Sequence, residues 1–275
     1  MRDPKLVTEA KNTHRIINQN PKKSLGQNFL VDPQALKQIA QLGEITKGQE
    51  IVEIGPGLGW LSSELLKFFP NLTVVEKDDQ LAKMLREKFG STIQIIHGDI
   101  LDNEIIDKLP ENFKIIANIP YSITTPLIQS IITSPKKILR IIILVQKEVA
   151  ERLSAPSGKS YRAALTVALE YYGKVSTDII IAPTSFWPAP NVESQILIIE
   201  PYPNKTIEKD FIDFLYKGFR QKRKKLKNSI SEGLSWNKLK VEELLANVKI
   251  NENLRPEDLT VSQWRELWQR VEKMS

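Results

Sequence analysis

The sequence predicts an α/β protein, with a mostly parallel sheet covered by helices and a small all-helical C-terminal domain. From residue 50 onward, short β-branched apolar runs alternate with amphipathic segments, which is the order of a βαβ series. After residue 203 the strand signals stop and helical patterns follow. We therefore divide the chain into residues 1–203, an N-terminal arm plus the sheet domain, and residues 204–275, a helical domain.

Five apolar runs predict buried parallel strands because each is short and rich in β-branched residues. They span residues 50–54, 72–75, 93–96, 113–117 and 138–145. Helical patterns over residues 61–69 and 80–89 separate the first three runs. Residues 175–181 and 194–199 predict an antiparallel pair at the sheet edge, and the long proline-rich loop between them is expected to be functional.

Three helical patterns are found in the C-terminal domain. They span residues 205–222, 238–246 and 262–272. In the last pattern, Trp264 and Trp268 are four residues apart, as are Leu267 and Val271. This spacing favours one buried helix face over a surface that stacks nucleobases.

The composition excludes several classes of protein. The chain has no cysteine, so a disulfide framework, a zinc knuckle and a thiol nucleophile are excluded, and a reducing cytoplasm fits best. No run approaches the roughly 20 apolar residues of a membrane helix. The N-terminal residues lack the layout of a secretory signal, so we expect a soluble cytoplasmic protein.

The net charge of +6 is unevenly distributed along the chain. Residues 1–50 hold 8 basic and 5 acidic side chains, residues 51–200 hold 15 and 17, and residues 201–275 hold 16 and 11. Basic ends are expected if they hold a polyanion. The densest cluster, here called the basic cluster, consists of Arg220, Lys222, Arg223, Lys224, Lys225 and Lys227. Taken alone, it fits a solvated helix face as well as a nucleic-acid surface.

The first predicted strand runs into a glycine turn, EIGPGLG at residues 53–59. A dinucleotide-binding turn has the spacing G-x-G-x-x-G, whereas here the third glycine comes one residue early. The pattern E-x-G-x-G-x-G is typical of S-adenosylmethionine sites, in which glycines such as Gly55 and Gly57 let the backbone approach a ligand. A tight strand-to-helix turn without a ligand remains the alternative.

Carboxylates follow the next two strands. Glu76 lies 21 residues after Gly55 and can accept hydrogen bonds from both hydroxyls of a ribose. Asp99 follows the third strand, where the exocyclic amine of an adenine would lie, although it could instead cap the following helix. These positions predict an adenosine-like ligand without selecting the reaction.

The fourth strand ends in NIPY at residues 118–121, and this tetrapeptide indicates the reaction. The exocyclic amine of adenine is a poor nucleophile because its lone pair is delocalised into the ring. The Asn118 oxygen and the carbonyl of Ile119 or Pro120 could draw the amine toward tetrahedral geometry, with its lone pair facing a methyl group. Pro120 fixes the local backbone and Tyr121 offers a flat surface to the base. Alignment would supply most of the rate without a strong general base, and a plain strand-ending turn remains the alternative.

With these motifs, the chain resembles the ribosomal RNA adenine dimethyltransferase family over nearly its whole length. The motifs that carry the resemblance are GQNFL (26–30), the glycine turn, NIPY (118–121), QKEV (146–149), FWPAPNVES (186–194), RQKRK (220–224), NS (228–229) and RPE (255–257). One departure is Leu25, where the family usually has Phe. An aromatic surface near the base or the cofactor would then be missing, although Phe29 remains.

The resemblance implies a Rossmann-like, S-adenosylmethionine-dependent methyltransferase sheet that needs no metal. The implied cofactor contacts come from Asn28, Leu30, Gly55, Gly57, Glu76, Asp99 and Asn118, and the implied base pocket from Asn118, Pro120, Tyr121 and Phe186. The implied substrate is a pair of adjacent adenosines in the 3′-terminal hairpin loop of small-subunit rRNA, each dimethylated at N6 in an immature subunit. The basic cluster would then contact phosphates, and we expect a monomer.

Three alternatives remain. A related methyltransferase of large-subunit rRNA, which confers antibiotic resistance, would share the motifs, but the RPE segment and the extended Phe186 loop favour the small-subunit enzyme. A ribosome-assembly factor with little catalytic activity is disfavoured by Asn118 and Glu76. A nicotinamide oxidoreductase is disfavoured by the glycine spacing and by NIPY.

Overall fold

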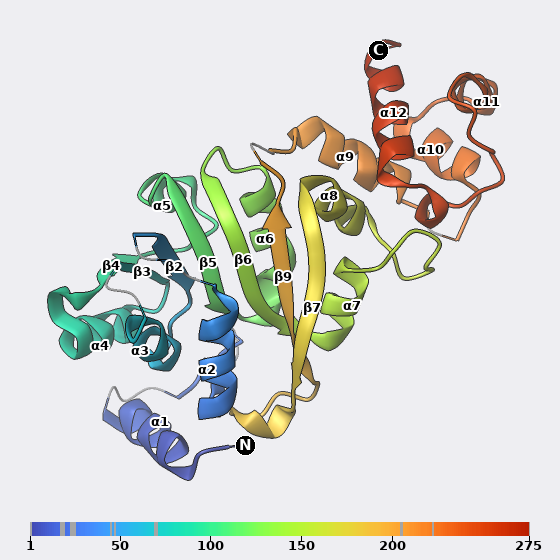
Figure 1. Ribbon diagram of the computed structural model, residues 1–275. Coiled ribbons are helices and arrows are strands. Elements are labelled where there is room, and N and C mark those ends of the chain that lie inside the picture. Colours follow the sequence, from blue (N-terminus) through green and yellow to red (C-terminus); the bar gives the residue numbers. More distant parts are fainter. Residues whose placement is uncertain are drawn as a thin grey trace. The chain divides into compact units, whose positions relative to one another are not determined.

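The computed structural model describes residues 2–16, 20–22, 26–44, 46, 48–68, 71–203, 206–221 and 223–274 (Figure 1). Two residues singled out above, Leu25 and Lys222, lie outside the described residues. The strands are β1 (Phe29–Leu30), β2 (Glu50–Ile54), β3 (Leu72–Glu76), β4 (Gln94–His97), β5 (Asn112–Asn118), β6 (Lys137–Gln146), β7 (Gly173–Ile181), β8 (Phe186–Trp187) and β9 (Ser194–Pro201).

Helices alternate with the strands of the sheet and then continue to the C-terminus. The α-helices are α1 (Pro4–Ile16), α2 (Pro33–Leu42), α3 (Trp60–Leu66), α4 (Asp79–Phe89), α5 (Asn103–Asp107), α6 (Thr124–Ile132), α7 (Lys147–Leu153), α8 (Ala164–Tyr172), α9 (Lys209–Gly218), α10 (Leu226–Leu234), α11 (Lys238–Asn247) and α12 (Val261–Glu272). Short 3-10 turns are η2 (Gly90–Thr92), η3 (Tyr121–Ile123), η4 (Pro183–Ser185) and η5 (Pro256–Asp258). No helix in the described part of the chain is long and apolar enough to cross a membrane.

A seven-stranded sheet with the order β4-β3-β2-β5-β6-β9-β7 confirms the predicted α/β class. The five predicted apolar runs became β2 to β6, which pair in parallel, and β9 runs antiparallel to β6. At the edge, Gln195 Nε2 donates to the Asp178 carbonyl and the Tyr202 N–H donates to the Tyr172 carbonyl. β7 and β9 are neighbours in the sheet, and these bonds link residue 195 with 178 and residue 202 with 172, so the chain directions are opposite, as expected for an antiparallel pair.

The parallel register brings several strand ends to one level. Ile54 lies opposite Val75 and Glu76 opposite His97. Glu53 lies opposite Ile116, so that Gly55 is level with Asn118 two residues further along. Strand order also reverses between β2 and β5, and ligands of open α/β sheets bind at the carboxyl ends of strands beside such a reversal.

A second, two-stranded ribbon was not predicted. In it, β1 pairs antiparallel with β8, with Phe29 opposite Trp187 and Leu30 opposite Phe186. His14 of α1 packs against both aromatic rings, at centroid distances of 5.2 Å from Phe29 and 5.5 Å from Trp187. Two residues per strand are too few to give a periodic pattern, so only tertiary pairing identifies this ribbon.

Helix α2 was also not predicted, although the sequence carries its signals. Asp32 is its N-cap and accepts the backbone N–H groups of Gln34 and Ala35, and Pro33 occupies the first turn. This Asp-Pro pair before an apolar pattern is a helix-start signal.

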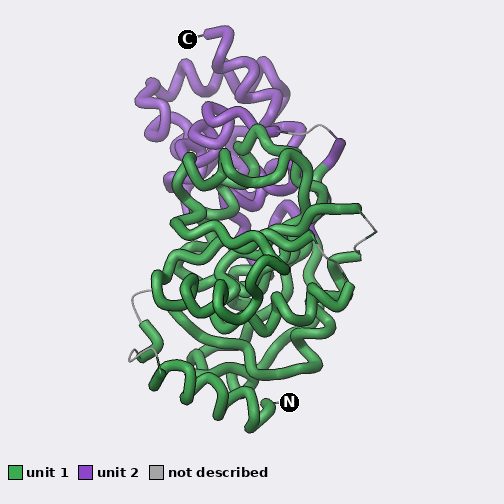
Figure 2. The backbone as a smooth tube through the Cα atoms, turned by 90° about the vertical axis from the view of Figure 1, so that its left-hand side faces the viewer, with its two compact units in different colours: residues 1–150, 176–201 green, residues 151–175, 202–275 purple. Residues whose placement is uncertain are grey.

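The chain divides into two compact units (Figure 2). The first comprises residues 1–150 and 176–201, and the second comprises residues 151–175 and 202–275. Residues 151–175, predicted to belong to the sheet domain, therefore group with the C-terminal helices, and α8 packs against α9 and α12. The domain boundary at residue 203 stays a prediction.

The predicted buried face of α12 is confirmed, because Trp264, Leu267, Trp268 and Val271 are all buried. The Trp264 ring lies 5.3 Å from that of Phe219. Its indole N–H also donates to the backbone carbonyl at residue 256. Trp264 is thus an anchor of the second unit's core.

The predicted helix over residues 205–222 is wrong in its extent. Helix α9 ends at Gly218, and α10, which was not predicted, begins at Leu226. Between these two helices, the described residues of the basic cluster lie in turns and irregular backbone and do not share one helix face. A continuous helix would align cations three and four residues apart, whose repulsion disfavours it.

Replacing Trp264 with Ala should lower the free energy of unfolding by about 3–5 kcal/mol, because a fully buried indole is removed and a cavity remains. Urea unfolding followed by far-UV circular dichroism measures this change. Leu239→Ala is the control, since Leu239 is 70% exposed and its loss should change stability by no more than about 0.5 kcal/mol. Equal effects of the two substitutions would contradict the packing described here.

Candidate functional site

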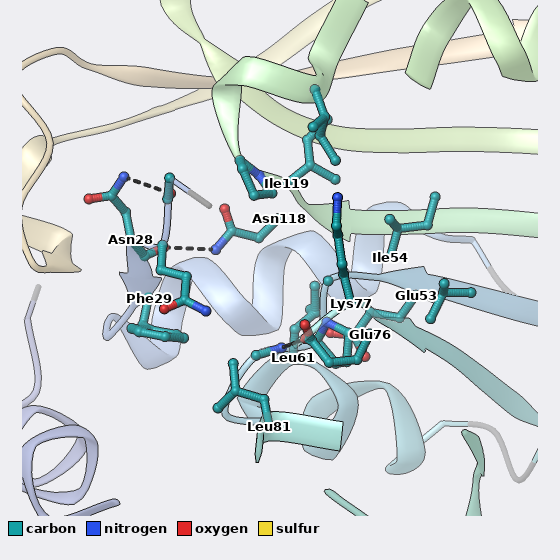
Figure 3. A pocket seen from close by; sticks show the side chains of 18 of the residues that line it. Asn28, Phe29, Glu53, Ile54, Leu61, Glu76, Lys77, Leu81, Asn118 and Ile119 are labelled. Carbon is teal, nitrogen blue, oxygen red and sulfur yellow. Dashed lines mark hydrogen bonds between the residues drawn. The ribbon is translucent and has the colours of Figure 1, made fainter. Parts of the chain in front are cut away.

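One cavity lies at the carboxyl edge of the sheet beside the strand-order reversal (Figure 3). Its walls come from the arm at residues 26–30, from the segments that follow β2, β3, β4 and β5, from Leu36 of α2 and from Phe186 of β8. The structure places every predicted cofactor and base-pocket residue on this wall: Asn28, Leu30, Gly55, Gly57, Glu76, Asp99, Asn118, Pro120, Tyr121 and Phe186. Their individual roles stay predictions.

The three positions of the turn require glycine for different structural reasons. All have positive φ angles, which disfavour any residue with a Cβ. A Cβ on Gly57 would lie 2.9 Å from the Phe29 ring, and one on Gly59 would lie 2.7 Å from the Phe89 ring. On Gly55 the nearest atom would be the Asn118 carbonyl oxygen, 4.0 Å away. Only at Gly55 does the missing side chain leave open space, whereas the other two glycines make room for protein side chains.

Glu76 connects the glycine turn to the end of β3. Its carboxylate accepts the backbone N–H of Gly57 at 3.1 Å through one oxygen and that of Asp78 at 2.9 Å through the other. Burial raises the pKa of Glu76, although these two hydrogen bonds offset part of the effect. Each carboxylate oxygen keeps lone-pair capacity, so Glu76 can still accept hydrogen bonds from hydroxyl groups in the cavity.

A second buried carboxyl, Glu53, also lines the cavity. Its pKa is raised to about 8, chiefly by burial and to a lesser extent by the nearby Glu76, while the hydrogen bond from the Ser62 hydroxyl and the Lys88 ammonium oppose the shift. In the sequence, Glu53 is recognisable only as the first residue of the glycine turn. The structure adds that two carboxyl groups, Glu53 and Glu76, lie close together in a poorly solvated place, which favours a cationic ligand.

Asp99 differs electrostatically from these two carboxyl groups. Burial would raise its pKa, but hydrogen bonds from the Lys77 ammonium at 2.6 Å and the Leu101 N–H at 3.0 Å outweigh burial and lower it. Asp99 is therefore an ionised acceptor at neutral pH. It does not cap the following helix α5, whose N-cap residue is Asp102.

The turn after β5 packs against the N-terminal arm. Asn118 Nδ2 donates to the Asn28 carbonyl at 3.5 Å, and this contact leaves Oδ1 as the amide atom that can accept a hydrogen bond (Figure 3). The Pro120 carbonyl accepts the N–H of Ile123, which begins the next turn. A Cβ on Gly26 would lie 3.2 Å from Pro120, so the arm fits closely over this turn.

Aromatic side chains line the cavity near this turn. Phe186 is 1% exposed and is fixed by the pairing of β8 with β1. The Tyr121 hydroxyl lies 2.7 Å from the hydroxyl of Ser194. Burial raises the pKa of Tyr121, so its phenol stays protonated at neutral pH and cannot act as a general base.

The members of the basic cluster in the second unit are not equivalent. Lys227 pairs with Glu242 at 2.7 Å and with Glu252 at 3.0 Å, and these two hydrogen bonds raise its pKa. Lys225 donates to the Asn253 side chain, and Arg220 lies 3.9 Å from Glu232. Arg223 and Lys224 are exposed. Lys227 therefore connects elements of the unit, whereas Arg223 and Lys224 are the more available cations.

Several contacts of the site were missed by the sequence reasoning. Lys22 pairs with the buried carboxylate of Asp78 at 2.7 Å and holds the arm to the start of α4. Glu9 of α1 accepts the indole N–H of Trp60, which connects α1 to the helix after the glycine turn. Asp78 was recognisable as a helix cap from its position before α4, but no sequence signal indicates its pairing with Lys22.

Among the described residues, no group of three or more His, Asp or Glu side chains could hold a metal ion. The polar side chains that line the cavity include three carboxyl groups, the amides of Gln27, Asn28 and Asn118 and the Lys77 ammonium, and aromatic rings lie among them. Such a set can bind a ligand carrying hydroxyl and amine donors, a positive charge and a flat ring.

Replacing Glu53 with Gln should alter the pH dependence of stability. The pKa of Glu53 in the folded protein, about 8, exceeds its ordinary value of 4.5, so the neutral carboxyl favours folding. This contribution is fully present below pH 4.5 and is lost as the pH rises through about 8. The free energy of unfolding, measured between about pH 5 and pH 9, should therefore fall less in Glu53→Gln than in the wild type. Parallel curves for the two proteins would contradict the proposed titration.

A family model described as ribosomal RNA adenine dimethylase matches residues 18–273. A protein named ribosomal RNA small subunit methyltransferase A, from Fusobacterium nucleatum subsp. nucleatum, is 38% identical over 254 residues, which cover 90% of this chain and 96% of the relative. A protein of the same name from Alkaliphilus oremlandii is 33% identical over 273 residues, covering 94% of this chain and 95% of the relative.

Solved structures show a similar fold. A dimethyladenosine transferase from Plasmodium falciparum has a TM-score of 0.76 at 22% identity, covering 89% of this chain and 98% of that chain. A 23S rRNA methyltransferase has a TM-score of 0.67 at 24% identity, covering 89% and 99%. These likenesses concern the fold alone. Because the family model spans almost the whole described chain and the relatives share more than 30% identity, the chain belongs to the ribosomal RNA adenine dimethylase family of methyltransferases.

Proposed function

We propose that this protein transfers methyl groups from S-adenosylmethionine to N6 of two adjacent adenosines in the 3′-terminal hairpin loop of 16S rRNA, dimethylating each. The observation that carries the proposal is that Asn118, Tyr121 and Phe186 share one cavity with Gly55, Glu76 and Asp99. The names of the relatives, which refer to the small ribosomal subunit, favour this rRNA. We further propose that the protein acts as a cytoplasmic monomer on an immature small subunit.

The cavity residues fit the cofactor. Glu76 would accept hydrogen bonds from the ribose hydroxyls, and Asp99 would accept one from the adenine amine. The open side of Gly55 leaves room for close backbone approach, while Asn28, Leu30 and Gly57 complete the wall. The poorly solvated Glu53 and Glu76 would gain from a positively charged ligand. When bound, this cofactor supplies an electrophilic methyl group on a sulfonium.

The protein's own part in the reaction is to align the target amine. We propose that Asn118 Oδ1 and the Ile119 carbonyl accept the two N–H groups of the target adenine, so that the nitrogen lone pair faces the methyl group. The Pro120 carbonyl is the weaker candidate because it already accepts the Ile123 N–H. The nitrogen–carbon bond forms as the sulfur–carbon bond breaks, and the amine then loses its proton to solvent. Alignment of this kind can contribute about 7–11 kcal/mol to lowering the barrier.

An adenine can reach the cavity only when it is unpaired and turned out of its stack. Tyr121 and Phe186 offer it aromatic surfaces within the cavity. In the second unit, the exposed Arg223 and Lys224 would hold phosphates without reading sequence. Specificity would then depend on the shape of the rRNA in its particle.

Mass spectrometry of adenosines in immature small subunits, after incubation with the protein and S-adenosylmethionine, tests the proposal. We expect two N6,N6-dimethyladenosines in the 3′-terminal hairpin. Large-subunit rRNA is the parallel substrate, and methylation there instead would favour the antibiotic-resistance activity. Binding to small subunits without methyl transfer would favour an assembly factor, and either result would refute the proposed function.

Asn118→Ala should reduce N6 methylation by about 10²–10³-fold, because an acceptor that aligns the amine is lost. Binding to immature small subunits should be unchanged, since Asn118 lies in the cavity of the first unit. Single-turnover methyl transfer and filter binding measure the two effects. Equal loss of binding and methylation would contradict this division of roles.

Neutralising Lys222, Arg223 and Lys224 together should have the converse effect. RNA affinity should fall, and its dependence on salt should weaken because fewer phosphates are neutralised. Binding isotherms at several salt concentrations measure this change, while binding of S-adenosylmethionine alone should be unaffected. Lys227→Gln is the matched control, because Lys227 is paired with Glu242 and Glu252. It should lower the free energy of unfolding but have little effect on RNA affinity. A larger loss of affinity in the control than in the triple variant would refute the assignment.

A further inference from the structure

Ser194 is the last residue of the FWPAPNVES motif (186–194), and the proposed function gives it no role. It is the first residue of β9 and ends the segment that begins with Phe186. Its side chain is fully buried, and it lies opposite Gln146 in the pairing of β6 with β9. The backbone carbonyl of the neighbouring Glu193 accepts the N–H of Lys147 at 3.0 Å, and the Glu193 carboxylate accepts the Lys147 ammonium at 2.8 Å. The backbone that carries the Ser194 hydroxyl is therefore held firmly.

The hydroxyl of Ser194 meets the Tyr121 hydroxyl at 2.7 Å. Tyr121 lines the cavity, whereas Ser194 does not. An aromatic ring attached only at Cβ can turn about two side-chain torsions, and a hydrogen bond at its far end restricts both. Because burial raises the pKa of Tyr121, this bond joins two neutral hydroxyl groups at neutral pH.

The same segment also shapes the other aromatic surface of the cavity. At its beginning, Phe186 is held by its pairing with Leu30, and at its end Ser194 holds Tyr121. The two aromatic residues thus depend on one stretch of chain whose ends are anchored in different sheets. Correct spacing of the rings is required if a flat base is to enter between them.

We propose that Ser194 is a positioning residue for methyl transfer: its hydroxyl holds the Tyr121 ring in the plane against which the target adenine stacks. This inference rests on the proposed function. Ser194 touches neither substrate nor cofactor and acts through Tyr121. A base displaced from this plane presents its amine poorly to Asn118, and small misplacements of reacting groups slow such reactions strongly.

Single-turnover methyl transfer at saturating protein and S-adenosylmethionine tests the inference. Ser194→Ala should be about tenfold slower than the wild type, the effect of losing one hydrogen bond from the aligned state. Its affinity for immature small subunits and its KM for S-adenosylmethionine should be unchanged. Ser194→Thr, which keeps the hydroxyl, should restore most of the rate.

Tyr121→Phe removes the same hydrogen bond from the other side and leaves Ser194 intact. It should slow the reaction about as much as Ser194→Ala, and the double variant should be no slower than either single variant, because all three lack one shared interaction. Thr73→Val is the control for loss of a buried hydroxyl, since Thr73 bonds to Gln94 within the sheet and does not line the cavity. It should retain the wild-type rate.

Full activity of Ser194→Ala would overturn the inference and leave the proposed function standing. The inference would also be overturned if Ser194→Ala and Ser194→Thr were equally slow, or if affinity for the subunit fell in step with the rate, because either result indicates a general structural role. Additive effects of Ser194→Ala and Tyr121→Phe would have the same consequence. Absence of transfer by the wild type would overturn both proposals.

Discussion

The parallel register of β2 with its two neighbours, β3 and β5, is the constraint on which the site depends. Parallel strands that share a register end at the same edge, and here this brings Gly55, Glu76 and Asn118 to one level. The reversal of strand order between β2 and β5 keeps a covering helix from closing the edge there. A shift of one residue in either pairing would turn these side chains to opposite faces of the sheet and dismantle the cavity.

The cavity holds two buried carboxyl groups, Glu53 and Glu76, whose ionisation is disfavoured by burial. Lys77 neutralises Asp99, but Glu53 and Glu76 lie in poorly solvated positions, and burial raises the pKa of both. Lys88 is near Glu53, and burial lowers its own pKa. A cationic ligand beside them would favour their ionised forms and so lower both pKa values.

The N-terminal arm completes the cavity through contacts that no local sequence pattern predicts. Its Phe29 occupies the space left by Gly57, and its ribbon with β8 connects the cofactor side to the segment between Phe186 and Ser194. The family motifs at both places were visible in the sequence, but their pairing was not, because two-residue strands have no periodicity. The helix predicted over residues 205–222 ends early for a different reason: α9 ends at Gly218, and a continuous helix would place the cations of the basic cluster three and four residues apart.

Local patterns in the sequence predict the class of fold, the strands of the sheet and the residue types at the ends of those strands. Apolar periodicity, the glycine spacing and the NIPY tetrapeptide are patterns of neighbouring residues, so they can be recognised along the chain. The tertiary structure is needed to see which glycine of the turn leaves open space, which cations are already paired, and which hydroxyl holds Tyr121. These facts depend on distances between residues as many as 73 positions apart, which side-chain packing sets and a linear pattern does not encode.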